Sequence, residues 1–156
     1  METKGKKLIV FLVVLAMTSL SGFAFAEHFQ GVQGTPYWVD FLGEKFLISD
    51  EPATIGDEIG VFTKDGILCG VYAVKKPGQY GVLHVYGDDP STPVVEGALP
   101  GERLIFKVWD NERALTITVL DEDMWPYSAG SAAKPNFPII WTTERDIFGL
   151  NILLTK

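Results

Sequence analysis

Residues 103–120 read RLIFKVWDNERALTITVL and decide the fold class. Apolar residues alternate with polar ones on both sides of the polar segment Asp110–Arg113, and this period of two is the pattern of a strand with one buried face. The segments Arg103–Trp109 and Ala114–Leu120 are therefore predicted to form an antiparallel hairpin. Its core face comprises Leu104, Phe106, Val108, Leu115, Ile117 and Val119.

Six further segments have the alternation and the β-branched or aromatic content of short strands. They are Tyr37–Leu42, Lys45–Ile48, Glu58–Thr63, Ile67–Val74, Gln79–Tyr86 and Phe148–Leu154. The sequence thus predicts an all-β, single antiparallel two-sheet sandwich of about seven or eight strands, Ig-like or prealbumin-like. The one long irregular stretch is Asp121–Pro138, which is either a functional loop or a plain connection to the last strand.

The first 26 residues have the features of a signal peptide. Three lysines precede the apolar run Leu8–Met17, and Ala24-Phe25-Ala26 is the small-x-small pattern that signal peptidase reads. We expect residues 1–26 to be removed and residues 27–156 to form one exported domain, extracellular, at the cell surface or in the periplasm, with no stable membrane insertion after cleavage. The alternative is an uncleaved anchor over Leu8–Ala26.

The net charge argues against a protein that binds the phosphate backbone of a nucleic acid. The chain has 13 Lys and Arg against 20 Asp and Glu, a formal charge of -7. Because the leader carries three lysines and one glutamate, its removal changes that charge to -9. Nucleic acid is therefore not an expected partner. The single cysteine, Cys69, excludes an internal disulfide, and its place inside a predicted strand indicates a buried thiol.

The segment from Ile55 to Asp110 carries a more particular pattern, about a third of the chain. Its parts are Ile55-Gly56-Asp57-Glu58-Ile59, Asp65-Gly66-Ile67-Leu68-Cys69-Gly70, the loop Gly87-Asp88-Asp89-Pro90-Ser91-Thr92-Pro93, Glu96-Gly97-Ala98-Leu99-Pro100-Gly101-Glu102 and Phe106-Lys107-Val108-Trp109-Asp110. This resembles a β-sandwich module of exported and surface-attached bacterial proteins, and is loosely similar to immunoglobulin-like and prealbumin-like accessory domains. The resemblance implies a location and a fold, and no reaction.

The acidic loop offers one candidate site. Asp88, Asp89 and Glu96 are oxygen ligands of the kind that calcium takes, in a loop stiffened by Pro90 and Pro93. The alternative is that these carboxylates cap turns through hydrogen bonds to the backbone. Calcium is the only cofactor that the sequence suggests.

The aromatic residues of the second half offer another candidate. Trp109, Trp125, Tyr127 and Trp141 form a ligand-binding set if their rings are exposed, because planar rings on a sandwich stack on sugars. The alternative is that they are core. Near the mature N-terminus Tyr37 and Trp38 alternate, so one is expected in the core and the other on an outer face, where it favours a subunit contact.

Catalytic material is scarce, and we expect the chain not to be an enzyme. The two histidines are His84, in a predicted strand, and His28, in an N-terminus expected to be frayed. The sequence predicts a non-catalytic exported β-sandwich that acts by contact, as a surface-assembly subunit, spacer or adhesion module. Its expected partners are proteins or further copies of itself at the cell surface. A carbohydrate-binding module, with polysaccharide as partner, and a calcium-stabilised structural domain are the alternatives.

Overall fold

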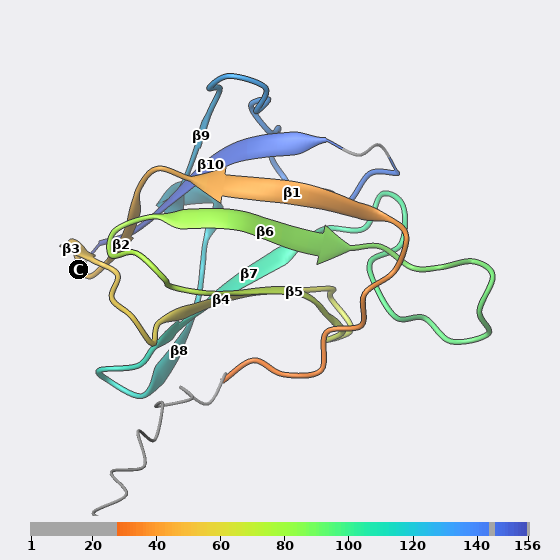
Figure 1. Cartoon of the computed structure of the whole chain (residues 1–156), viewed down its shortest axis with the longest axis horizontal. Coiled ribbons are helices and arrows are strands. Elements are labelled where there is room, and N and C mark those ends of the chain that lie inside the picture. The colour runs from red at the N-terminus through yellow and green to blue at the C-terminus, as the bar shows by residue number, and fades with distance from the viewer. Residues whose placement is uncertain (1–27, 144–145, 156) are drawn as a thin grey trace, which may run out of the picture.

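The computed structural model describes residues 28–143 and 146–155, and within them the chain forms two β-sheets packed against each other (Figure 1). The predicted signal peptide over residues 1–26 lies outside the described residues. The prediction of an all-β, two-sheet sandwich is confirmed.

The six-stranded sheet has the order β3-β2-β10-β1-β6, and β9 also pairs with β10. Its strands are β1 (Trp38–Gly43), β2 (Phe46–Ile48), β3 (Glu51–Pro52), β6 (Tyr80–Tyr86), β9 (Met124–Tyr127) and β10 (Ile147–Leu154). β1 and β2 both run parallel to β10, with Asp40 opposite Ile147 and Phe46 opposite Ile152. The prediction of a purely antiparallel sandwich is wrong for these two pairings, because the chain returns after β9 to place its last strand beside its first.

The four-stranded sheet has the order β5-β4-β7-β8 and is antiparallel throughout. Its strands are β4 (Glu58–Phe62), β5 (Leu68–Ala73), β7 (Ile105–Asp110) and β8 (Leu115–Thr118). The predicted hairpin of residues 103–120 lies in this sheet as the pairing of β7 with β8. The connection from β6 to β7 contains the acidic loop, which projects from one end of the sandwich (green in Figure 1).

The core lies between the two sheets and follows the predicted alternation. Phe41 of β1 meets Phe106 of β7 edge to face, with ring centroids 5.3 Å apart. Cys69 is fully buried in the same core, as expected. The prediction is wrong for Leu115, which is 51% exposed because it lies at the turn end of β8, an outer strand of its sheet.

The eight predicted strands are all present, and two more are not in the prediction. The two-residue strand β3 is one. The other is β9, which lies inside the stretch predicted to be irregular, after a short 3-10 turn at Asp121–Asp123. Within the described ranges, no helix is long and apolar enough to cross a membrane.

Candidate contact surface

The outer face of the six-stranded sheet begins with β1. Val39 and Phe41 of this strand point into the core, so Trp38, Asp40 and Leu42 point outward, and each of these three is half-buried. A strand whose outer face carries a tryptophan and a leucine is not a typical solvated surface.

The neighbouring strand β6 adds to the same face. Leu83 and Val85 are fully buried, which directs Val82, His84 and Tyr86 outward. Val82 is 52% exposed. In the antiparallel pairing of β1 with β6, Trp38 lies opposite Tyr86 and Asp40 lies opposite His84. We call the surface of Trp38, Asp40, Leu42, Val82, His84 and Tyr86 the β1–β6 face.

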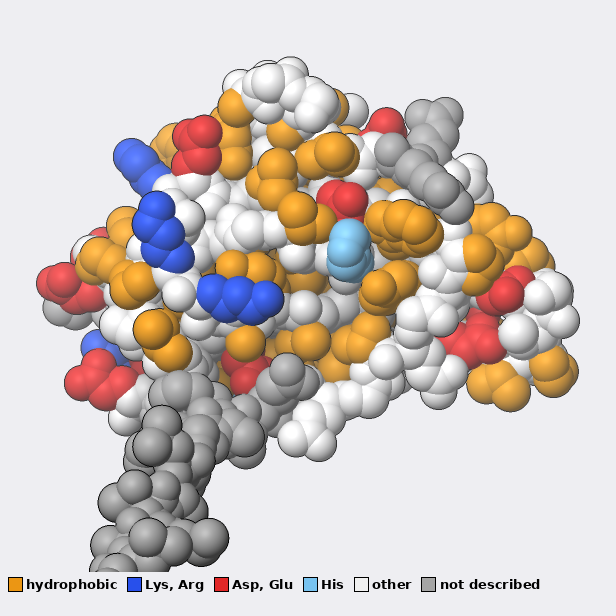
Figure 2. All heavy atoms as spheres, in the orientation of Figure 1, with side chains coloured by type: hydrophobic (Ala, Val, Ile, Leu, Met, Phe, Trp, Pro, Cys, Tyr) orange, Lys and Arg blue, Asp and Glu red, His pale blue; other side chains and the backbone are white. Residues whose placement is uncertain are grey.

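A polar pair lies at the centre of this face. His84 Nδ1 is hydrogen-bonded to the Asp40 carboxylate, and the two side chains are 47% and 16% exposed. The His84 ring lies 6.0 Å from the Trp38 ring and 6.1 Å from the Tyr86 ring. Figure 2 looks onto β1 and β6 and shows hydrophobic side chains gathered around a histidine and a carboxylate. Such a face combines apolar area with one orienting polar pair.

The face continues toward β9 on the far side of β10. Trp125 lies opposite Asn151 and is 60% exposed, while Tyr127 lies opposite Gly149 and is half-buried. The Tyr127 hydroxyl donates a hydrogen bond to the Leu42 carbonyl of β1, 3.1 Å away. Two of the four predicted ligand-binding aromatics are therefore on the outer face of the same sheet.

Trp109 lies on the other sheet, where the N-terminal residues cover it. The His28 ring stacks on the Trp109 ring, with centroids 3.7 Å apart and an interplanar angle of 2°. His28 Nε2 also lies 3.2 Å from the Thr116 hydroxyl. The expectation that His28 is frayed is thus wrong.

A buried carboxylate holds this N-terminal segment in place. Glu58, 3% exposed, accepts hydrogen bonds from the backbone N–H groups of His28, at 2.6 Å, and Phe29, at 2.8 Å. The Phe29 ring packs over Gly60, where an added Cβ would lie 2.8 Å from it. We call His28 and Phe29 the N-terminal strap. No local sequence signal predicts it, because its partners are about thirty or more residues away.

Trp141 belongs to the core. It is 2% exposed, and its indole N–H donates to the Val85 carbonyl, 3.3 Å away. Its ring fills the space above Gly87, where an added Cβ would lie 1.9 Å from the ring. It therefore does not contribute an exposed ring, and the four predicted aromatics do not form one set.

The carboxylates of the acidic loop hold the loop together. Asp88 accepts the Glu96 N–H at 3.1 Å and Asp89 accepts the Ser91 N–H at 2.9 Å, while the Thr92 hydroxyl donates to Glu96 at 2.5 Å. Hydrogen bonds from the side chain and backbone of Ser91 lower the pKa of Asp89. These contacts are those of turn capping.

Among the residues that the structure describes, no group of three or more His, Cys, Asp or Glu side chains is arranged so that it could hold a metal ion. Calcium binding by the acidic loop stays a prediction, which a melting experiment addresses below. Comparison of the chain with protein-family models, with curated proteins and with solved structures finds no match.

Proposed function

We propose that the chain is a non-catalytic, exported β-sandwich that acts by contact through the β1–β6 face, as a subunit or spacer of a surface assembly or as an adhesion module. The observation that carries the proposal is the composition of this face. Trp38, Val82 and Tyr86 surround the Asp40–His84 pair on the outer surface of the sheet, where Val82 is 52% exposed and the Trp38 and Tyr86 side chains are half-buried. Contact surfaces are rich in aromatic residues, with a few polar groups that fix orientation.

Export supports this reading from the sequence side. The sequence predicts a leader over residues 1–26, and export would bring the domain to surface polymers and other exported proteins. The acidic charge keeps such a protein apart from nucleic acid and from anionic membrane surfaces. The aromatic residues of the β1–β6 face support a contact role for a domain in this position.

The test compares two matched variants. Val82→Glu puts a charge on the β1–β6 face, and Leu115→Glu puts the same charge on an equally exposed strand position of the other sheet (52% against 51%). Self-association by light scattering and binding to the surface of the producing cells are measured for both. We expect Val82→Glu to weaken association by at least about tenfold, because a charge must then be buried without a partner, and Leu115→Glu to behave as the unmodified protein. A strictly monomeric protein that binds no cell-surface material contradicts the proposal.

Carbohydrate binding is a second candidate, favoured by the placement of Trp125 and Tyr127 two residues apart on the outer face of β9. Retarded migration in polysaccharide gels, lost in Trp125→Ala, is the expected result. Unchanged migration across a broad panel of polysaccharides rejects this candidate and leaves the contact proposal intact.

A further inference from the structure

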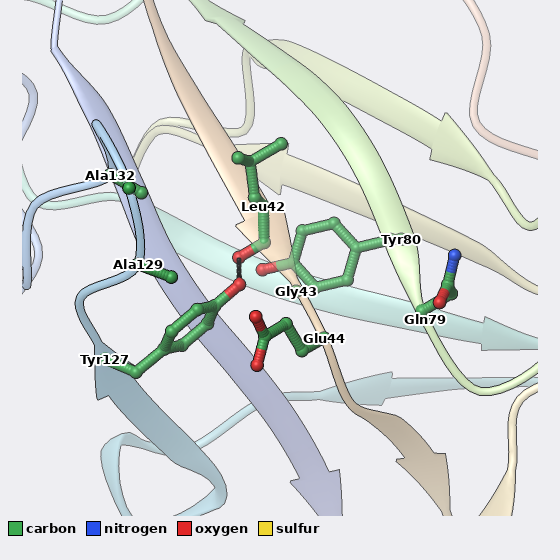
Figure 3. Close-up of a pocket in the computed structure, with 9 residues that line it drawn as sticks. Leu42, Gly43, Glu44, Gln79, Tyr80, Tyr127, Ala129 and Ala132 are labelled. Atoms are coloured by element: carbon green, nitrogen blue, oxygen red, sulfur yellow. Dashed lines mark hydrogen bonds between the residues drawn. The ribbon is translucent and has the colours of Figure 1, made fainter.

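A cleft of about 440 Å³ opens at the end of the six-stranded sheet. It is bounded by the ends of β1 and β6, by Tyr127 of β9 and by the loop Ala129–Ala132 (Figure 3). Its volume falls within the range of small-molecule sites. None of the six residues that define the β1–β6 face except Leu42 contributes to it.

One wall of the cleft is made of small residues. The Ala129 N–H donates to the Ala132 carbonyl at 3.3 Å, and the Ala132 N–H donates to the Ala129 carbonyl at 2.9 Å. Because the backbone groups of these two alanines satisfy each other, each alanine adds a methyl group to the lining and no free backbone N–H. Together with Leu42 they form an apolar flank.

The oxygen atoms of the opposite side act as acceptors. The Tyr127 hydroxyl gives its hydrogen to the Leu42 carbonyl, and the Tyr80 hydroxyl gives its hydrogen to the Leu150 carbonyl. The Tyr127 oxygen, on a half-buried side chain, therefore keeps only lone pairs for a ligand, whereas Tyr80 is 3% exposed and belongs to the buried base of the cleft. The Glu44 carboxylate, an acceptor when ionised, lies on the Tyr127 side of the cleft in Figure 3. Gln79, which has both a donor and an acceptor, lies at the far edge of the cleft.

The charge of the cleft has one sign. Its described lining includes Glu44 and no Lys, Arg or His. Burial first, and the Glu44 carboxylate second, raise the pKa of Tyr127 above its ordinary value. The Tyr127 phenol therefore stays protonated at neutral pH, and Glu44 is the one acidic side chain in the described lining.

We propose that this cleft binds a primary ammonium group on an aliphatic stem, carried by a free alkylamine or by a lysine side chain of a partner. An ammonium has three N–H donors and no acceptor, which complements the Glu44 carboxylate and the Tyr127 oxygen. The stem packs against Leu42 and the alanine wall. This site goes beyond the contact function, because it requires no partner on the β1–β6 face.

The test is a titration of the purified protein with n-butylamine at pH 7, followed by amide chemical shifts. Saturable shifts are expected at Gly43, Glu44 and Gly130, and n-butanol at equal concentration is expected to give none. Glu44→Gln removes the charge while keeping the shape, and should weaken butylammonium binding about fivefold, as expected for a partly solvated ion pair. The matched control Glu112→Gln makes the same charge change on the exposed turn of the other sheet and should leave binding unchanged.

A blocking variant gives a second line of evidence. Ala129 is exposed at the cleft wall, so Ala129→Phe fills the cleft from a position that tolerates a larger side chain and should abolish the shifts. Equal binding of amine and alcohol, equal weakening by Glu44→Gln and Glu112→Gln, or an absence of saturable shifts each overturns the proposal.

The source of the ammonium is resolved by a third ligand, Nα-acetyl-lysine methylamide. Binding equal to that of n-butylamine assigns the cleft to a lysine side chain. Binding of n-butylamine alone assigns it to a free amine. Both results keep the ammonium chemistry, and neither depends on the outcome of the Val82→Glu experiment.

Discussion

Replacing Glu58 by alanine should detach the N-terminal strap and destabilise the domain. The substitution removes two hydrogen bonds from backbone N–H groups to a buried carboxylate, at 2.6 and 2.8 Å. Hydrogen bonds to a charged group contribute about 1.5–3 kcal/mol each. If the strap stayed docked in the variant, with both N–H groups unsatisfied, the protein would lose about 3–6 kcal/mol of stability. Undocking of the strap costs less free energy than staying docked, because water then hydrogen-bonds to both N–H groups.

The cost of Glu58→Ala is therefore limited by what undocking loses. That loss is the burial of Phe29, about 2 kcal/mol for a phenylalanine side chain, and the stacking of His28 on Trp109, about 1 kcal/mol. We expect a loss of about 3 kcal/mol in the free energy of unfolding, or about 10 °C in Tm for a domain of this size. Tryptophan emission should shift to longer wavelength as the Trp109 ring becomes exposed to solvent.

The assay is urea unfolding followed by circular dichroism, with native-state tryptophan emission measured on the same samples. Glu112→Ala, on an exposed turn of the same sheet, is the matched control and should change stability by less than about 0.5 kcal/mol. If Glu58→Ala also stays within about 0.5 kcal/mol and its emission is unchanged, Glu58 does not hold the strap and the reasoning fails.

Three other predictions concern the core, the thiol and the acidic loop. Gly87→Ala should prevent stable folding or shift Trp141 out of place, since the new methyl would lie 1.9 Å from that ring; unchanged near-ultraviolet circular dichroism contradicts this. Burial, with a smaller effect of Glu102, raises the pKa of Cys69 from 9.0 to about 12. Since the raised pKa favours the thiol in the folded state, stability should be complete below pH 9 and fall above it, by about 2 kcal/mol at pH 10.5; Cys69→Ala should remove most of that fall, and equal curves for both proteins refute it. If the loop 88–96 binds calcium, Tm should rise with calcium concentration and drop with chelator, whereas the turn-capping contacts alone predict one melting curve under all three conditions.

Local alternation predicts the strands because it depends only on which face of a segment is buried. It misses β9 for a physical reason. Pro126 interrupts the alternation within β9. Because proline has no backbone N–H to donate, it is normally confined to edge strands, and its presence argues against a strand prediction. The parallel placement of β10 beside β1 is also hidden, because it depends on a pairing between residues more than a hundred positions apart.

The candidate surface is only partly visible in the sequence. The alternation of Tyr37 and Trp38 indicates an apolar outer face, although neither residue is core: Tyr37 is 39% exposed and Trp38 is half-buried. The cross-strand register then adds Tyr86 and His84. For Trp141 the prediction of an exposed ring is wrong, because this side chain is buried. Its burial follows from the absence of a side chain at Gly87, a relation between two loops that no local pattern carries.

Side-chain oxidation footprinting tests the central claim most directly, because it reports which residues a partner covers. The protein is labelled by hydroxyl radicals alone at low concentration and again when self-associated or bound to the surface of its producing cells. The account predicts strong protection of Trp38, Val82 and Tyr86, with Phe62 and Trp109 on the other sheet unchanged. Protection of Phe62 and Trp109 with an unprotected β1–β6 face contradicts it.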